Sequence, residues 1–146
     1  MTRLTGGCAC GRVRYAVEIA KPDGYLCHCR MCQRASGNVS LALTGVLQAD
    51  FEWERACDWW RSSAIAERGF CSACGTSLAF RYLDSPKQDL TVASFDTPEV
   101  FPCTSHFGVE NRNEAFAHPA PGLPEMRCDA YDLLNAKWEA AGGRPD

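Results

Sequence analysis

The sequence predicts an all-β fold built mainly of antiparallel sheets, and two observations support this class. Near the N-terminus, Val13, Tyr15 and Val17 alternate with charged residues that include Arg14 and Glu18. A period of two residues is typical of a strand with one buried face. Further along the chain, short segments of strand-forming residues alternate with turn-forming ones. Strands joined by short turns pair antiparallel, so an antiparallel domain is the simplest arrangement.

Four further strands are expected after the first one. They span residues 38–44, 47–53, 77–82 and 90–95. Turn-forming residues punctuate these segments at Gly45, Gly75, Asp84-Ser85-Pro86 and Thr97-Pro98. The segment between His106 and Met126 is rich in Pro, Gly, Asn and Ala, which predicts an irregular connection.

One short helix is predicted near the C-terminus. Tyr131, Leu134 and Trp138 share a helical face at i, i+3, i+7 spacing, and Asp129 precedes them as a candidate N-cap. We expect this helix to cover one edge of the sheet. The chain has 146 residues and no internal repeat, which fits a single domain over residues 1–146 with a core of its own.

Charge and hydropathy disfavour several classes of partner. The net charge is -3 and no block of Lys or Arg is present, so the sequence shows no electrostatic footprint for nucleic acid or an anionic membrane. No charged segment followed by an apolar run opens the chain, and no segment approaches the roughly 18 apolar residues of a membrane span. We therefore expect a cytoplasmic protein that binds neither nucleic acid nor membrane.

Seven of the ten cysteines fall into three clusters with the spacing of metal ligands. The clusters are Cys8-x-Cys10, Cys27-His28-Cys29-x-x-Cys32 and Cys71-x-x-Cys74. A disulfide framework is the alternative, but it is typical of small secreted domains, whereas cysteines in a cytosolic chain more often bind metal. A redox pair at Cys71 and Cys74 is disfavoured because no βαβ pattern surrounds it. The spacing favours zinc.

The clusters divide into two kinds of site. A glycine follows the second cysteine in Cys10-Gly11 and in Cys74-Gly75, where it lets the backbone turn its amide groups toward the sulfurs. These two clusters together predict a closed four-cysteine site that stabilises the fold. The middle cluster offers three thiolates with no fourth cysteine nearby, which predicts a site with an open coordination position.

These motifs, with their flanking residues, resemble one known family. The segments Gly7-Cys8-x-Cys10-Gly11, Cys27-His28-Cys29-x-x-Cys32-x-Arg34-x-Ser36-Gly37 and Phe70-Cys71-x-x-Cys74-Gly75-Thr76 are similar to those of the glutathione-dependent formaldehyde-activating enzyme family, which also includes centromere protein V. The resemblance covers residues 6–112. It implies a β-tent fold, a structural zinc on Cys8, Cys10, Cys71 and Cys74, and a more labile zinc on Cys27, Cys29 and Cys32 close to the substrate.

The resemblance also implies an activity and a partner. In the family, glutathione and formaldehyde combine to S-(hydroxymethyl)glutathione, so we expect a zinc-dependent carbon–sulfur lyase that uses a small thiol. Arg34 is a candidate for binding a glutathione carboxylate by a bidentate fork, with a solvated surface arginine as the alternative. His106 resembles a histidine that the family places late in the domain, so His28 and His106 join Arg34 as candidate substrate-binding residues, with a packed, singly hydrogen-bonded histidine as the alternative for His106. His28 is expected to form hydrogen bonds rather than to bind the metal, because a fourth ligand would close the site.

Other functions remain open on the sequence alone. One is a non-catalytic module that binds zinc or glutathione, and another is nucleic-acid contact through a zinc-ribbon-like turn, which the acidic balance disfavours. Cys57, Cys103 and Cys128 are expected to be small buried hydrophobic residues, although Cys103 could approach the second metal together with His106. The aromatic residues between Phe51 and Trp60 are expected in the core. The sequence does not predict an oligomeric state.

Overall fold

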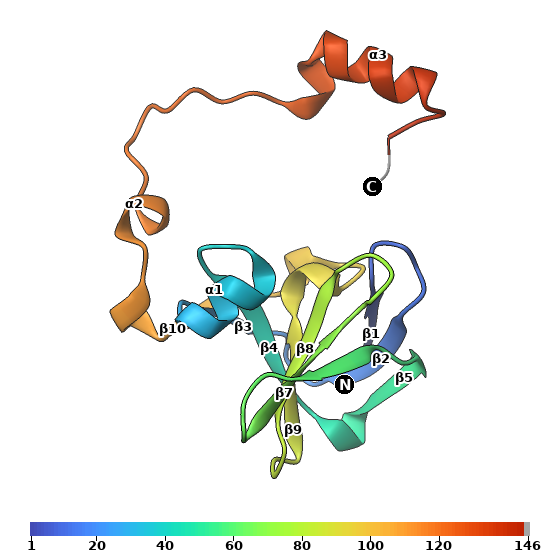
Figure 1. Ribbon diagram of the computed structural model, residues 1–146, viewed down its shortest axis with the longest axis vertical. Helices are drawn as coiled ribbons and strands as arrows, with labels where there is room; N and C mark the ends of the chain where they lie inside the picture. Colours follow the sequence, from blue (N-terminus) through green and yellow to red (C-terminus); the bar gives the residue numbers. More distant parts are fainter. Residues whose placement is uncertain (145–146) are drawn as a thin grey trace. The chain divides into compact units, whose positions relative to one another are not determined.

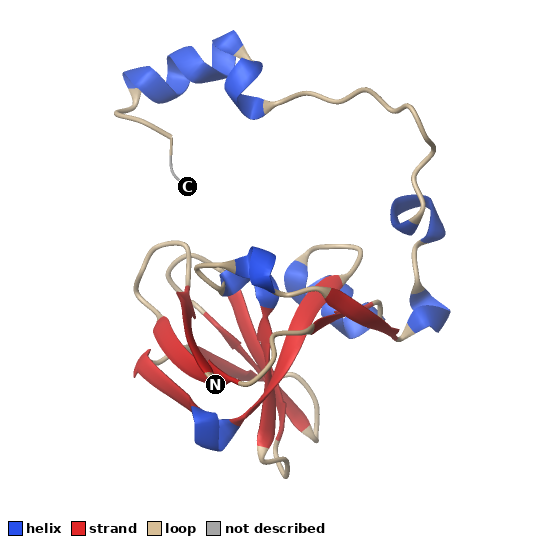
Figure 2. Cartoon of the chain, turned by 180° about the vertical axis from the view of Figure 1, so that it is seen from behind, coloured by secondary structure: helices blue, strands red, loops and turns tan. Residues whose placement is uncertain are grey.

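A computed structural model describes residues 1–144, which fall into two units (Figure 2). Residues Met1–Asn113 form the first unit, and the second begins at Glu114. All the described strands belong to the first unit, whereas the second contains helices and loops. The expectation of a single domain over residues 1–146 stays a prediction.

Two sheets make up the first unit (Figure 1). The smaller has the order β1-β2-β5 and the larger the order β10-β3-β4-β9-β8-β7-β6. The strands are β1 (Thr2–Gly7), β2 (Arg14–Ile19), β3 (Gly24–Cys27), β4 (Leu41–Leu47), β5 (Phe51–Arg55), β6 (Asp58–Arg61), β7 (Ala66–Phe70), β8 (Ser77–Tyr82), β9 (Lys87–Thr91) and β10 (Cys103–Phe107). The all-β class is confirmed. One pair departs from the antiparallel expectation, because β10 runs parallel to β3 after the long connection that parallel pairing requires.

The main core lies between the two sheets. Val13, Tyr15 and Val17 are almost fully buried, as expected from the sequence, but Ala16 on the opposite face of the strand is buried as well. The Tyr15 hydroxyl forms a 2.8 Å hydrogen bond with Ser94 Oγ, so its polar end is satisfied within the core. Buried residues from the facing side of the larger sheet, such as Leu90, belong to the same cluster.

A smaller apolar cluster lies on the other face of the larger sheet, under the helix α1 (Arg30–Ser36). It combines Cys27, Cys32 and Leu43 with the partly buried Tyr25 and Leu41. Strand pairing explains this arrangement, because Tyr25 faces Leu43 and Cys27 faces Leu41 in the ladder between β3 and β4. The larger sheet is therefore covered on both faces near the start of α1.

Several strand boundaries differ from the expected ones because pairing overrides local composition. β8 has the expected bounds. β4 begins only at Leu41, because α1 precedes it; α1 ends at Ser36 and is capped by Gly37, whose φ of 66° is left-handed. Gly45, expected in a turn, lies within β4 opposite Asp89. β9 pairs with β4 only as far as Thr91, after which the chain enters a 3-10 turn. The expected segment 47–53 likewise divides into a 3-10 turn and β5.

The sequence patterns missed five strands and two helices. The missed elements are β1, β3, β6, β7, β10, α1 and α2 (Glu114–Ala117). α1 has only seven residues, too few for a helical period to stand out. β1 ends in Gly6 and Gly7, a residue type that is depleted in strands. Short 3-10 turns join the elements at Gln48–Asp50, Val92–Ser94, Pro98–Val100, Val109–Asn111 and Cys128–Ala130.

The second unit contains α2 (Glu114–Ala117) and α3 (Asp132–Ala140). The expected C-terminal helix is present, but Asp129 is not its N-cap. Helix α3 begins three residues later, and the Asp129 carboxylate accepts a 2.8 Å hydrogen bond from Arg127 instead. The expectation that this helix covers a sheet edge stays a prediction. The segment 106–126, expected to be irregular, contains only α2 and one 3-10 turn after the end of β10.

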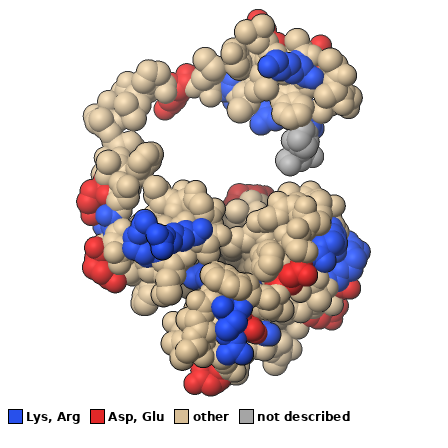
Figure 3. All heavy atoms as spheres, viewed as in Figure 1, with Lys and Arg blue, Asp and Glu red and all other residues tan. Residues whose placement is uncertain are grey.

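The described helices include none that is long and apolar enough to cross a membrane. On the face shown in Figure 3, basic and acidic side chains are interspersed rather than gathered in a basic stripe. The expected lack of a nucleic-acid partner stays a prediction.

Candidate metal centres

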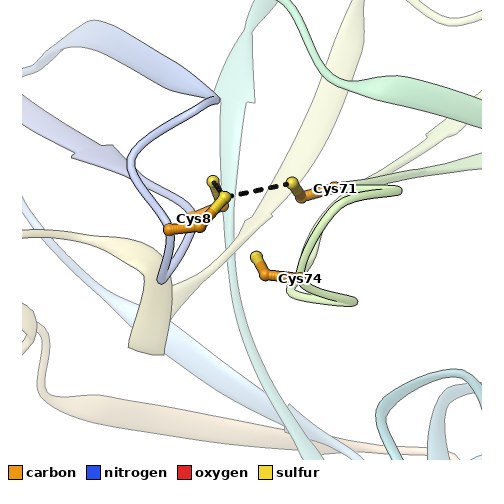
Figure 4. A group of neighbouring side chains, drawn as sticks. Cys8, Cys71 and Cys74 are labelled. Carbon is orange, nitrogen blue, oxygen red and sulfur yellow. Dashed lines mark hydrogen bonds between the residues drawn. The ribbon is translucent and has the colours of Figure 1, made fainter. Parts of the chain in front are cut away.

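Four cysteines from two distant loops meet in the first unit (Figure 4). Cys8 and Cys10 lie between β1 and β2, while Cys71 and Cys74 lie between β7 and β8. The four sulfurs lie within 4.8 Å of one another. This group therefore joins a loop of the smaller sheet to a loop of the larger sheet.

The backbone around this group turns at two glycines. Gly11 and Gly75 have φ values of 77° and 78°, a left-handed conformation that other residues rarely adopt. The Gly75 N–H donates to the Cys71 carbonyl at 2.7 Å, and the Gly11 N–H donates to the Cys8 carbonyl at 3.0 Å. Both loops thus turn at the glycine after the second cysteine, through a hydrogen bond that spans three residues in the first loop and four in the second.

Donors surround the sulfurs of the four-cysteine group. The Val13 N–H lies 3.2 Å from Cys8 Sγ, and Arg12 Nε lies 3.4 Å from Cys71 Sγ. A hydrogen bond with the Thr76 hydroxyl and further backbone donors lower the pKa of Cys74 to about 5. Burial acts to raise the pKa of Cys71, but the Arg12 guanidinium and backbone amides hold it below the ordinary value. These contacts favour the thiolate forms of Cys71 and Cys74, as metal binding requires.

Three further cysteines form a second group at the start of α1. Cys27 ends β3, Cys29 is the N-cap of α1, and Cys32 lies in its first turn. Their sulfurs also lie within 4.8 Å of one another, and in the described chain this group has only three members. Cys27 and Cys32 are 3% and 5% exposed, whereas Cys29 is partly exposed.

The surroundings shift the pKa values of the thiols in this group in opposite directions. Burial raises the pKa of Cys27 to about 12. Burial acts in the same direction on Cys29, yet the backbone N–H of Cys32 and the two neighbouring thiols hold the pKa of Cys29 below its ordinary value. The Cys32 N–H lies 3.4 Å from Cys29 Sγ. Cys29 is therefore the member of the group that loses its proton most readily.

The sulfur spacing fits a metal ion in both groups. Tetrahedral zinc with Zn–S bonds of about 2.3 Å places two sulfur ligands about 3.8 Å apart. The distance is 3.5 Å between Cys8 and Cys10 and 3.8 Å between Cys10 and Cys71. It is 3.4 Å between Cys27 and Cys29. All ten cysteines are free thiols, so the clusters are available for metal rather than joined as disulfides.

The structure pairs the two histidines expected near the second group. His28 Nε2 lies 3.0 Å from His106 Nδ1, and the rings stack with centroids 5.2 Å apart. His28 is buried and His106 is exposed. Neither ring joins the ligand group of Cys27, Cys29 and Cys32. The parallel pairing of β10 with β3 brings the two rings together, although they are 78 residues apart in sequence.

Arg34 is exposed in the last turn of α1. It lines an open cavity of about 360 Å3 with Arg30, Gln33 and residues that follow the helix. Gln33 is buried and connects α1 to two other segments of the chain. Its Nε2 donates to the carbonyl oxygens of His28 at 2.7 Å and of Asn111 at 3.0 Å. Two arginines and the hydrogen-bonded Gln33 therefore line the same cavity.

Two arginines that contact sulfur were missed from the sequence. Arg12 donates to Cys71, and Arg68 in β7 donates to Cys32 at 3.4 Å. Alternation along β7 indicates that Arg68 shares a face with Ala66, but it does not say which face lies against α1. Only the pairing of the strands determines that orientation.

The three remaining cysteines lie outside both groups. Cys57 is buried as expected, but Cys103 and Cys128 are exposed, so the expectation of burial is wrong for these two. Cys103 pairs with Gly24 at the end of β10 that is remote from Cys27, and therefore does not close the second group.

The aromatic residues are mostly core residues, as expected. Phe51, Trp53 and Trp59 pack against the main cluster. Trp60 differs, being 57% exposed beside a second cavity.

The chain is similar to several known proteins. A sequence model described as glutathione-dependent formaldehyde-activating enzyme matches residues 3–110. A Schizosaccharomyces pombe protein, named as an uncharacterized lyase, is 29% identical over 82 residues that cover 56% of this chain and 60% of that protein. The crystal structure of a Rhodobacter sphaeroides protein matches with a TM-score of 0.54 and 22% identity, covering 63% of this chain and 87% of that one. This structural likeness concerns the fold alone.

Proposed function

Because the chain belongs to the glutathione-dependent formaldehyde-activating enzyme family, we propose that it is a zinc-dependent carbon–sulfur lyase. Its substrate would be a thiol–aldehyde adduct such as S-(hydroxymethyl)glutathione, which forms from glutathione and formaldehyde. Similarity to a protein named as a lyase supports a reaction of this type. We expect a cytoplasmic location, where thiols stay reduced.

The observation that carries this proposal is the difference in ligand number between the two cysteine groups. Structural zinc sites are usually closed by four protein ligands, whereas catalytic sites keep three and leave one position for substrate. The group around Cys71 has four sulfurs, and the group around Cys29 has three among the described residues. We therefore assign the first group to a structural zinc and the second to a catalytic one.

Each residue of the second group has a distinct part in this proposal. When bound there, zinc supplies an open coordination position and holds a substrate thiol as its thiolate near neutral pH. Cys27 and Cys32 hold the buried side of the site, and the partly exposed Cys29 marks the side open to substrate. The three thiolates keep the site electron-rich, which favours sulfur as a nucleophile over activation of a carbonyl.

Three further residues are proposed to form the substrate-binding site, two in contact with the substrate and one that positions a neighbour. The exposed guanidinium of Arg34 is suited to a bidentate contact with a glutathione carboxylate. His106 is also exposed, and its hydrogen bond to His28 fixes the orientation of its ring. In this arrangement His28 acts through His106 rather than on the metal.

The proposal is tested by exchange NMR on an equilibrium mixture of formaldehyde and glutathione, with and without the zinc-loaded protein. This measurement is preferred because the uncatalysed addition can be fast enough to mask catalysis in an end-point assay. We expect the protein to accelerate exchange between free glutathione and its adduct. The acceleration should fall in Cys29→Ser by more than the roughly 10- to 100-fold that loss of a residue supporting the ligands costs, because Cys29 is itself a proposed ligand.

Cys103→Ser is the matched control, since Cys103 is an exposed cysteine outside both groups. It should keep the full acceleration. If the wild-type protein binds two zinc ions and still gives no acceleration, the lyase assignment is wrong.

A further inference from the structure

Arg68 is a buried cation that contacts the three-cysteine group. It lies on β7 and is 6% exposed. Its Nη2 is 3.4 Å from Cys32 Sγ, and its Cζ lies 4.9 Å from the centroid of the Phe80 ring. The guanidinium therefore lies between a sulfur of the group and the face of an aromatic ring.

No described acidic side chain forms an ion pair with Arg68. Its neighbour Glu67 pairs with Arg81 on the adjacent strand instead, at 2.6 Å. A buried guanidinium without an anion is strongly unfavourable, because the desolvation of the charge is not compensated. The ring of Phe80 offsets only part of this penalty. An anion is therefore needed on the side of Cys32.

The three-cysteine group, when it holds a metal, supplies such an anion. Three thiolates and one divalent ion carry a net charge of -1, and the permanent charge of the guanidinium brings the total to zero. We propose that Arg68 is the buried counter-ion of this metal site, a positioning residue that orients Cys32 and stabilises the metal-loaded state. The inference rests on the metal site of the proposed function, but not on its lyase reaction.

The geometry also explains why this position suits arginine. A planar guanidinium can donate an N–H to sulfur while its face lies over an aromatic ring, whereas an ammonium group is a strongly hydrated point charge. Arg68 also lines a cavity of about 210 Å3 with Trp60, Phe70 and Ala35 of α1. Arg68 therefore both lines this cavity and contacts the three-cysteine group.

The test compares Arg68→Met with Arg81→Met, because methionine removes the charge and the donors but keeps a long side chain. Arg81 is the matched control: it lies on the adjacent strand β8, pairs with Glu67 and stacks on Trp59. Metal affinity is measured by chelator competition with the cobalt(II)-loaded and zinc-loaded proteins, without substrate. We expect Arg68→Met to weaken the three-cysteine site by about 10- to 100-fold, the range for residues that support metal ligands. The four-cysteine site should be unchanged, and Arg81→Met should leave both sites unchanged.

Arg68→Lys keeps the charge but lacks the planar fork that donates to Cys32 while lying over the Phe80 ring, and it serves if Arg68→Met does not fold. In the cobalt(II)-loaded protein, loss of the N–H donor to Cys32 should move the sulfur-to-metal charge-transfer band of the three-cysteine site to longer wavelength. A general loss of stability would not produce that shift. Wild-type affinity together with an unshifted band would overturn the inference, and so would a wild-type protein that binds metal only at four cysteines. Failure of the exchange assay with two metals bound would overturn the lyase proposal alone.

Discussion

Single side chains determine how charge is distributed around the four-cysteine and three-cysteine groups. Arg12 donates to Cys71 in the first group, and Arg68 donates to Cys32 in the second. Arg12 is exposed and also pairs with Asp58, whereas Arg68 is buried. Because water screens the first contact, losing Arg12 should matter little, while losing Arg68 leaves a buried group without its charge partner.

Asp96 gives this protein a pH dependence that can be measured away from the metal groups. It accepts hydrogen bonds from Arg14 Nη1 at 2.9 Å and from the Thr5 hydroxyl at 2.6 Å, and these contacts lower the pKa of Asp96 to about 2. A carboxyl whose folded-state pKa is lowered stabilises the fold above its unfolded value of 3.8, and this contribution is lost as the pH falls toward 2. The side chain is 45% exposed, so screening limits the contribution to less than about 1 kcal/mol.

We expect Asp96→Asn to flatten the decline in the free energy of unfolding between about pH 4 and pH 2. Urea unfolding at a series of pH values measures this slope. Asp84→Asn, in the exposed turn between β8 and β9, should leave the slope unchanged. An equal slope in Asp96→Asn and the wild-type protein would show that Asp96 makes no such contribution.

At the scale of elements, the turn after β10 holds the segment that carries the second cysteine group. The His28 N–H donates to the Phe107 carbonyl at 2.8 Å, next to the last pair of the ladder between β3 and β10. Gly108 follows with a φ of 65°, and an added Cβ there would lie 2.9 Å from the backbone nitrogen of Cys29. The N-terminus of α1 is thus held by a strand that comes late in the chain.

This contact predicts a specific effect of Gly108→Ala. The substitution forces a non-glycine residue into a left-handed conformation, which costs about 1–2 kcal/mol, and also displaces the backbone of Cys29. We expect lower stability together with weaker metal binding at the three-cysteine site, measured by thermal unfolding and chelator competition.

Gly37→Ala separates the two effects of that substitution. Gly37 has a φ of 66°, but nothing lies within 4 Å of its added Cβ. Gly37→Ala should lower the free energy of unfolding by about 1–2 kcal/mol and leave the metal affinity of the three-cysteine site unchanged. Equal metal affinities in the two variants would contradict the proposed link between the turn and Cys29.

At the scale of the whole molecule, a metal bound by the four-cysteine group would link the two sheets through its bonds to sulfur. Cys8 and Cys10 belong to a loop of the smaller sheet, and Cys71 and Cys74 to a loop of the larger one. The three-cysteine group lies at one end of the larger sheet and on the helix beside it. The two groups should therefore differ in their importance for stability.

We expect Cys71→Ser to destabilise the protein by more than about 4 kcal/mol, because metal binding at a structural site contributes directly to folding. Cys27→Ser should stay folded with one zinc ion in place of two. Zinc content and circular dichroism of both variants measure this difference. If Cys27→Ser unfolds while Cys71→Ser stays folded, the division into a structural and a catalytic site is reversed.

The sequence by itself determined the features that depend on local spacing. Two ligands two or three residues apart can meet at one ion without help from the rest of the chain, so the cysteine clusters were evident. Period-two alternation likewise identified Val13, Tyr15 and Val17 as a buried face, because a strand side chain's face depends only on its position. The cysteine clusters and the all-β class could therefore be predicted.

Only the tertiary structure decided which distant residues meet. The parallel pairing of β10 with β3 brings His28 to His106, and the order of the larger sheet brings Arg68 to Cys32. Short strands such as β3 and the seven-residue α1 have too few residues for a period to appear, so their ends were not predicted. Contacts of this kind depend on strand order and register, which arise from the packing of the whole core and not from any local segment.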